Sequence, residues 1–287
     1  MNPILQCMLA ATLWMGAHEV PAPDVSWVPE RPVQGHLFRL RVRPDAGVVV
    51  QSIEGEAGGE ALHFVPIEGG LFESLAPVPI DTEGVVRASV TVIGRDGTRA
   101  STTVEIGVAP GEYRHERLSV APRLGGALGS ADAARLATDQ AKAAEVARQA
   151  HAAPRLWTEN RVMPRDARVT SGFGNGRIFN DDVSSRHMGL DLDGDPGDLV
   201  VAPTRGVVAL VDSFLLAGNI VYLNHGGGLL SGYFHLSEQL VAQGDTVEAG
   251  MPIGRVGATG RVTGPHLHWV VRIGTTSVDP RSLLEGG

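Results

Sequence analysis

Residues 266–273 read HLHWVVRI, and this stretch decides how the second half of the chain folds. Its β-branched and aromatic residues predict a β-strand. Residues two apart on a strand project to the same face, roughly 6–7 Å from each other. His266 and His268 are therefore expected to share one face, while Leu267 points to the opposite, buried face. Two neighbouring imidazoles suit neutral metal ligands and a proton shuttle, because two protonated rings would repel.

The residues around this strand are also β-rich. Glycine-punctuated segments supply further strands: VVAPTRGVVALVDS (200–213), NIVYLNHGGGLLSGYFHLS (219–237) and PIGRVGATG (252–260). The HGGG run between two apolar segments predicts a hairpin. Residues 244–257 predict another pair of short strands, with a turn at 248–250. Residues 161–287 are thus expected to form a mainly β domain.

The first half of the chain is predicted to be a second β domain, a small immunoglobulin-like β-sandwich over residues 23–110. Apolar and polar residues alternate with period two in FRLRVRP (38–44), GVVVQSI (47–53), VVRASVTVIG (85–94) and TTVEIGV (102–108). Turn sequences such as PDAG and GRDG separate these segments. His36 and His63 lie in strand-like context without carboxylate partners, so both are interpreted as structural.

Residues 111–160 are interpreted as a linker between the two domains. The alanine-rich run SADAARLATDQAKAAEVARQA (130–150) predicts a helix. Ser130 is the expected N-cap, and Asp132 lies in the first turn, where the helix dipole favours a negative charge. The apolar stripe of this helix is thin. A surface spacer is therefore favoured over a partner-binding helix.

Composition excludes several functional classes. The net charge of −8 argues against a nucleic-acid-binding protein, which would need a basic face. The single cysteine, Cys7, permits neither an internal disulfide nor a cysteine-based zinc cluster. DLDGDPGD (191–198) superficially suggests an EF-hand loop. Calcium is excluded because Pro196 stands where that loop needs glycine and Ala202 where it needs glutamate.

The beginning of the chain is predicted to be a signal peptide, residues 1–22. Residues 4–17, ILQCMLAATLWMGA, form its apolar core. This run is too short for a membrane span but has the length of a signal-peptide core. Export is therefore expected.

Three groups of histidine and aspartate lie in the second half of the chain: His187-x-x-x-Asp191, Tyr233-x-His235 and His266-x-His268. A catalytic zinc ion takes three protein ligands and keeps one position open for water. His187, Asp191 and one histidine of the last pair can supply these ligands. His235 and the other histidine of the pair are then left for acid–base work and oxyanion stabilisation.

The three groups together resemble peptidase family M23, the lysostaphin or LytM type of zinc peptidase. The family pattern of His-x-x-x-Asp, Tyr-x-His and Gly-Pro-His-Leu-His is met in order by 187–191, 233–235 and 264–268. SGFGNGR (171–177) precedes the first motif, and the likeness covers roughly residues 160–283. It implies a LytM-type antiparallel β-sheet peptidase domain over 161–287.

The resemblance also implies roles for the residues. In this family the second histidine of the pair binds the metal, which implies a Zn²⁺ ion held by His187, Asp191 and His268. His235 and His266 would then be the catalytic histidines. The implied substrate is the peptide of bacterial peptidoglycan, which would place the exported chain in the periplasm or cell envelope. Other cell-wall enzymes are possible partners.

Further substrate contacts are expected from Tyr233, Asn224, Arg177 and Thr263. The Tyr233 hydroxyl could help to stabilise the oxyanion, with plain strand packing as the equal alternative. Asn224 lies at the predicted hairpin turn next to His225, which is interpreted as an exposed turn residue.

Two other functions remain open at this point. A non-catalytic wall-binding or amidase-activating module would be expected to have lost at least one ligand, whereas all three are present here. A zinc peptidase acting on glycine-rich proteins would use identical chemistry, so the sequence does not separate it from a peptidoglycan endopeptidase.

Overall fold

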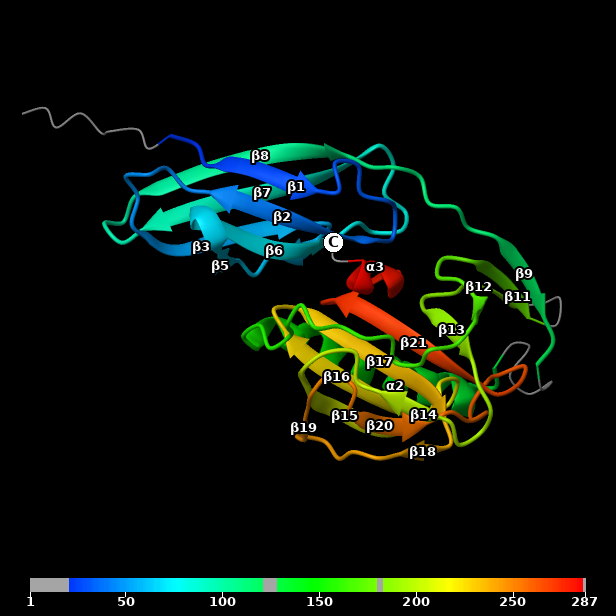
Figure 1. The fold of residues 1–287 in the computed structure, drawn as a ribbon. Coiled ribbons are helices and arrows are strands. Elements are labelled where there is room, and N and C mark those ends of the chain that lie inside the picture. The colour runs from blue at the N-terminus through cyan, green and yellow to red at the C-terminus, as the bar shows by residue number, and fades with distance from the viewer. Residues whose placement is uncertain (1–20, 121–127, 180–182, 286–287) are drawn as a thin grey trace, which may run out of the picture.

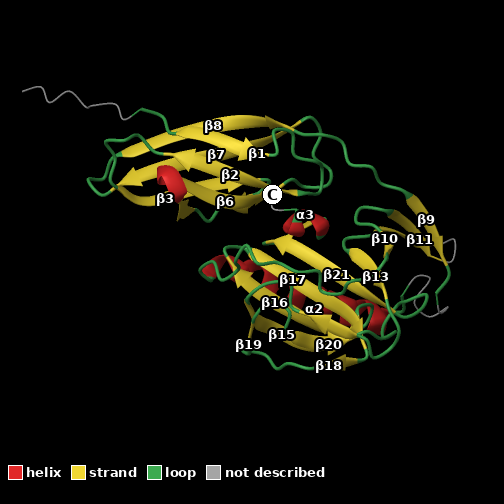
Figure 2. Cartoon of the chain, viewed as in Figure 1, coloured by secondary structure: helices red, strands yellow, loops and turns green. Residues whose placement is uncertain are grey.

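The computed structural model describes residues 21–120, 128–179 and 183–285, and its fold is mainly β, as predicted (Figure 2). A β-sandwich comes first, followed by a larger antiparallel sheet with one long helix on one face. The predicted signal peptide, residues 1–22, lies almost wholly outside the described residues. Within those described ranges, no helix combines the length and the apolar character needed to cross a bilayer.

The sandwich consists of two four-stranded antiparallel sheets (Figure 1). Their strand orders are β1-β2-β6-β5 and β4-β3-β7-β8. The strands are β1 (Asp24–Val28), β2 (Leu37–Arg43), β3 (Val50–Ala57), β4 (Glu60–Ala61), β5 (Val65–Ile67), β6 (Leu71–Pro77), β7 (Val85–Gly94) and β8 (Arg99–Gly107), with a short 3-10 turn, η1 (Glu68–Gly70). Both sheets contribute to one core, for example Leu40 from β2 and Val90 from β7. The immunoglobulin-like class stays a prediction, with which this strand order agrees.

The second part is built on an eight-stranded sheet with the order β10-β13-β21-β17-β16-β15-β19 and β22 beside β21. Its strands are β10 (Val169–Ser171), β13 (Leu190–Asp193), β15 (Gly206–Phe214), β16 (Gly218–Gly226), β17 (Leu229–Leu236), β19 (Thr246–Val247), β21 (His266–Ile273) and β22 (Thr276–Val278). A smaller sheet contains β14 (Leu199–Val201), β20 (Pro252–Arg255) and β18 (Glu238–Gln239), and the chain ends with α3 (Arg281–Leu284). The predicted hairpin is the β16–β17 pair.

Strand β21 places alternate residues on the two faces of this sheet, as predicted. Leu267, Trp269 and Val271 are fully buried in the main core. His266 and His268 lie on the other face, where His268 pairs with Phe234 of β17. The core thus lies on one side of the sheet and the histidine pair on the other.

Helix α2 (Ser130–Gln149) covers part of the face that carries the histidines. A cluster of buried apolar side chains joins α2 and η2 (Ala150–Ala152) to the sheet: Ala143, Val146, Ala147, Ala150, Phe214, Ile220, Tyr222 and Leu230. The predicted helix is therefore confirmed, but it packs against the sheet instead of serving as a spacer. Gly129, not Ser130, occupies the N-cap position.

The connection between the two parts contains a strand that the sequence did not reveal. Strand β9 (His115–Leu118) runs parallel to β11 (Gly176–Phe179), which pairs in turn with β12 (Val183–Arg186). The register sets Glu116 opposite Arg177. This three-stranded sheet forms a flank of the second part (Figure 1).

Glu60 of the sandwich joins the two parts at the β21–β22 turn. Its Oε1 accepts four hydrogen bonds of 2.8–2.9 Å, from the backbone N–H and the hydroxyl groups of Thr275 and Thr276. His151 Nε2 lies 3.0 Å from the other oxygen, and its Nδ1 lies 2.8 Å from His63 Nε2. The structural role predicted for His63 is thus a contact between the two parts of the molecule.

His36 also has a partner that its sequence neighbours did not reveal. Its Nε2 lies 3.7 Å from Oδ2 of Asp279, which follows β22 in the second part. The expectation that His36 lacks a carboxylate partner is therefore wrong.

Glu60→Ala should lower the free energy of unfolding at neutral pH by about 1–3 kcal/mol, because buried donors lose their acceptor. Burial alone would raise the pKa of Glu60, but hydrogen bonds from His151, Thr275 and Thr276 lower it to about 2. A lowered folded-state pKa contributes stability above the unfolded value of 4.5, and this contribution is lost as the pH falls toward 2. Urea unfolding should therefore show a smaller gap between wild type and variant at pH 3 than at pH 7. An equal gap at both would contradict the assignment.

Candidate metal centre

Three side chains meet where β13 and β21 lie side by side. His187 immediately follows β12, Asp191 lies on β13, and the register sets Asp191 opposite His268. Asp191 Oδ1 lies 3.0 Å from His187 Nε2 and 2.7 Å from His268 Nδ1. The two ring nitrogens are 3.0 Å apart. With one ligand atom taken from each residue, the three atoms lie within 4.8 Å of one another.

A hydrogen bond to the backbone fixes the tautomer of the His187 ring and the nitrogen that faces Asp191. Its Nδ1 lies 2.7 Å from the carbonyl oxygen of Gly172. A carbonyl can only accept, so Nδ1 carries the proton and the neutral ring turns the lone pair of Nε2 toward Asp191. The lone pair of Nε2 and the Asp191 carboxylate oxygen, 3.0 Å apart, could both coordinate one metal ion. The donor set therefore fits a metal ion.

The ionisation states of the other two residues suit metal binding as well. Burial lowers the pKa of His268 to about 4, so this ring is neutral at pH 7. Burial alone would raise the pKa of Asp191, but the contacts of its carboxylate with the His187 and His268 rings hold it well below its usual range. The site thus presents two imidazole rings and one carboxylate, a common ligand set for catalytic zinc.

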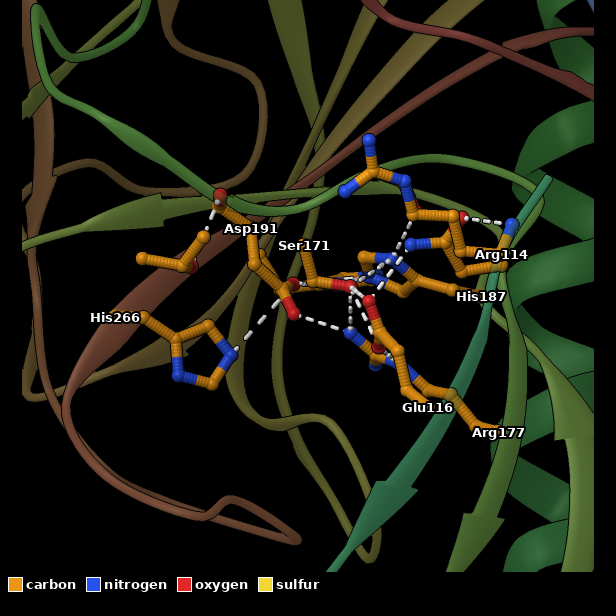
Figure 3. A network of polar contacts seen from close by, with 11 residues as sticks. Arg114, Glu116, Ser171, Arg177, His187, Asp191 and His266 are labelled. Atoms are coloured by element: carbon orange, nitrogen blue, oxygen red, sulfur yellow. Dashed lines mark hydrogen bonds and ion pairs between the residues drawn. The ribbon is translucent and has the colours of Figure 1, made fainter. Parts of the chain in front are cut away.

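The second oxygen of Asp191 is held by Arg177 of β11, whose Nη2 forms a short ion pair with Oδ2. The same guanidinium group donates to Ser171 Oγ at 2.8 Å and to Glu116 Oε2 at 3.3 Å. Glu116 also accepts hydrogen bonds from Ser171 at 2.9 Å and from Asn175 at 2.7 Å. Figure 3 shows these side chains in one connected network beside His187. Arg177, predicted to contact substrate, lines the cleft and binds Asp191, a candidate ligand.

His266 lies beside the three ligand residues. Its Nδ1 is 2.9 Å from the carbonyl oxygen of Gly264, so Nδ1 donates the proton and Nε2 is free of one in the neutral ring. Nε2 lies 3.6 Å from Asp191 Oδ1 (Figure 3). His266 can therefore accept a proton at the centre of the site.

His235 reaches the same place through an unusual backbone. Its φ of 63° is left-handed, which is uncommon for a residue with a side chain and often marks a functional position. Its Nδ1 lies 2.8 Å from the carbonyl oxygen of Thr259, and its ring centroid lies 4.9 Å from that of His266. Burial and the neighbouring histidines lower the pKa of His235 to about 3. Both predicted catalytic histidines are thus brought beside the predicted ligands.

Three residues that were expected at the site or at an exposed turn are instead structural. The Tyr233 ring is fully buried in the main core, and its hydroxyl lies 2.7 Å from Ser231 Oγ, so it does not reach the cleft. His225 is also fully buried, bonded to Ser231 and to the Arg205 carbonyl group. Asn224 accepts a hydrogen bond from the Gly226 backbone N–H, at the end of β16 away from His235. These three side chains of the β16–β17 hairpin therefore stabilise the fold and do not line the cleft.

Two neighbouring cavities flank the candidate ligands. One has a volume of about 260 Å³, and its lining residues include Asp191 and His266. Thr263, which was predicted to contact substrate, also lines this cavity. The other, of about 220 Å³, is lined among others by His187 and His268. The two share four lining residues: Arg177, Phe179, His235 and Arg261. The connecting segment adds Glu116, Leu118 and Val120 to the wall of the first cavity, a contribution with no recognisable motif in the sequence.

Known proteins with similar sequences cover the part of the chain that carries this site. The model of Peptidase family M23 matches residues 185–280. The peptidoglycan DD-endopeptidase ShyC of Vibrio cholerae is 35% identical over 117 residues, which are 40% of this chain and 27% of that protein. The DD-endopeptidase ShyA of the same organism is 40% identical over 105 residues, 36% of this chain and 24% of that protein. The chain thus matches only about a quarter of the length of these relatives.

One solved structure resembles nearly the whole chain. It is a Pseudomonas aeruginosa protein assigned to peptidase M23, with 25% identity and a TM-score of 0.69. The likeness covers 90% of this chain and 96% of that one, so it includes the sandwich as well as the larger sheet. The matched motifs, the family model and this shared fold agree, and the second part of the chain is a domain of peptidase family M23.

Proposed function

We propose that the chain is a zinc-dependent endopeptidase that hydrolyses the peptide cross-links of bacterial peptidoglycan. The observation that carries the proposal is the convergence of His187 Nε2, Asp191 Oδ1 and His268 Nδ1 within 3.0 Å of one another. Two further histidines lie beside these ligands in a cleft. Their presence favours an enzyme over a non-catalytic binding module.

Zinc suits the proposed ligands His187, Asp191 and His268, because it accepts two imidazoles and one carboxylate and leaves a position open. Once bound, it would lower the pKa of water and polarise the scissile carbonyl group. Arg177 holds the outer oxygen of Asp191 and thereby directs the other oxygen to the site. The ion pair with Arg177 thus fixes the orientation of Asp191, the one carboxylate among the three proposed ligands.

His235 and His266 carry the proposed proton transfers. Each anchors its Nδ1 on a backbone carbonyl oxygen and keeps Nε2 for the reaction. A neutral imidazole can accept a proton from the attacking water and can later donate one to the leaving amine. After protonation, either ring can also stabilise negative charge that develops on the carbonyl oxygen. Thr263 and Arg177 line the same cavity and are proposed to border the substrate.

Support for peptidoglycan as the substrate comes from the relatives named peptidoglycan DD-endopeptidases. Such a substrate favours the periplasm or cell envelope as the location, after removal of the signal peptide predicted at 1–22. We retain the division into a sandwich (23–110), a connection (111–160) and a peptidase domain (161–287). Peptidase activity on glycine-rich proteins is the alternative, and contacts with other cell-wall enzymes stay a prediction.

The full chain should release peptide-linked fragments from isolated peptidoglycan, detected by mass spectrometry. A zinc chelator should stop the release and added zinc should restore it. His268→Ala should abolish the release, and His266→Ala should lower its rate at least about 100-fold, through loss of proton transfer. His115→Ala, an exposed histidine on β9, is the matched control and should behave as wild type. Release that persists in the chelator would refute the metal assignment.

Glu116→Gln should weaken zinc binding about 10–100-fold, because residues that orient metal ligands contribute this much to affinity. The neutral side chain would hold Arg177 less firmly, and Arg177 orients Asp191. Competition with a chromogenic zinc chelator measures the affinity directly, without any substrate. Glu105→Gln, an exposed carboxylate on the sandwich, serves as the control. Equal affinities for Glu116→Gln and the control would show that Glu116 only stabilises the fold.

A further inference from the structure

Arg261 is a cation at the centre of the cleft that the mechanism above does not use. It lines both cavities beside the ligand residues, together with Arg177, Phe179 and His235. A substrate that extends through both cavities past the metal site must therefore pass the Arg261 side chain.

The guanidinium group of Arg261 has no anionic partner among the residues that the structure describes. It lies over the ring of Phe179, with Cζ 4.0 Å from the ring centroid. Burial, and then the charge of Arg177, lower the pKa of Arg261. Arg177 differs from it, because Glu116 and Asp191 both bind that guanidinium group. A partly buried cation without a counter-charge is costly, and an incoming anion would remove that cost.

The backbone holds Arg261 firmly in this position. Gly260 has a φ of 78°, and a Cβ atom there would lie 2.5 Å from backbone atoms of Gly218 and Leu216. The Arg261 N–H donates to the Leu216 carbonyl oxygen at 2.8 Å. The guanidinium group lies over the Phe179 ring, and an arginine packed on an aromatic ring can still use its N–H groups to bind an anion. The site is therefore preorganised for a planar, two-oxygen ligand.

We propose that Arg261 binds a carboxylate group of the substrate and selects peptides that carry a free carboxylate next to the scissile bond. This inference rests on the proposed endopeptidase function and adds a specificity residue to it. Arginine binds a carboxylate through two parallel hydrogen bonds, which gives directional recognition as well as charge. The ligand class is thus an acidic peptide.

The proposed contact also separates the two substrate classes left open by the sequence. In a cross-link formed on the distal amine of diaminopimelate, the carbon that bears the scissile nitrogen also bears a free carboxylate. In a glycine bridge the corresponding carbonyl group is already part of the next peptide bond. Only the first kind of link offers Arg261 an anion at this position, so the inference favours diaminopimelate cross-links.

The test uses two synthetic dimers of cross-linked stem peptides with diaminopimelate at the link. In one the carboxylate beside the scissile bond is free, and in the other it is a carboxamide. The full-length zinc-loaded wild type should cleave the carboxylate dimer with a kcat/KM about 10–100-fold higher. Arg261→Gln should reduce this ratio to near one, because it should slow cleavage of the carboxylate dimer more than cleavage of the carboxamide dimer. Arg261→Lys should keep part of the preference, because it retains the charge but not the paired hydrogen bonds.

Arg205→Gln is the matched control, since Arg205 pairs with Glu248 outside both cavities and its loss should leave the ratio unchanged. Thermal unfolding establishes that each variant is folded. Equal rates of wild type on both dimers, or an equal loss on both in Arg261→Gln, would overturn the inference. If wild type cleaves neither dimer, the proposed function fails, and calorimetric binding then decides the inference. Tighter binding of the carboxylate dimer by wild type but not by Arg261→Gln supports it, and any other binding result overturns it.

Discussion

The two oxygens of the Asp191 carboxylate bind different partners, and the geometry of the candidate metal centre depends on this difference. Oδ2 is held by Arg177, so Oδ1 is left facing two imidazole nitrogens. A carboxylate buried in this way must be compensated: Arg177 provides one cation, and a metal ion bound through Oδ1 would provide the other. The network around Glu116 is built to keep Arg177 in place. Even the pairing of β9 with β11 can be understood as a consequence of this requirement.

The two faces of the large sheet differ in role: one packs against the main core, and the other carries the histidines of the candidate site. Leu267 and Trp269 of β21 fill the core, and His266 and His268 between and beside them face the cleft. In strand β17 the alternation of faces does not continue to the last residues. Because Tyr233 faces the core, strict alternation would also turn the side chain of residue 235 toward the core. The left-handed backbone of His235 breaks the alternation and brings its ring to the catalytic side.

Much of this arrangement could be predicted from local sequence. The alternation in HLHWVVRI, the hairpin around HGGG and the alanine-rich helix all depend on neighbouring residues, and all three are present. Glu116 could not be predicted, because its role depends on a parallel pairing with residues sixty positions later. The burial of His225 could not be predicted for a similar reason: its hydrogen bond to Ser231 exists only once β16 and β17 have paired, and Ser231 also contacts Tyr233, for which core packing was the equal alternative.

The placement of Glu116 has a consequence for how this protein can be divided. A boundary drawn at residue 161 follows the family motifs, but it leaves behind a side chain that supports a ligand of the metal centre. The candidate metal centre therefore depends on residues outside the predicted peptidase domain, 161–287. An exchange of the N-terminal half between related enzymes would transplant part of the active site along with it. The segment before residue 161 therefore contributes to the candidate metal centre as well as to the fold.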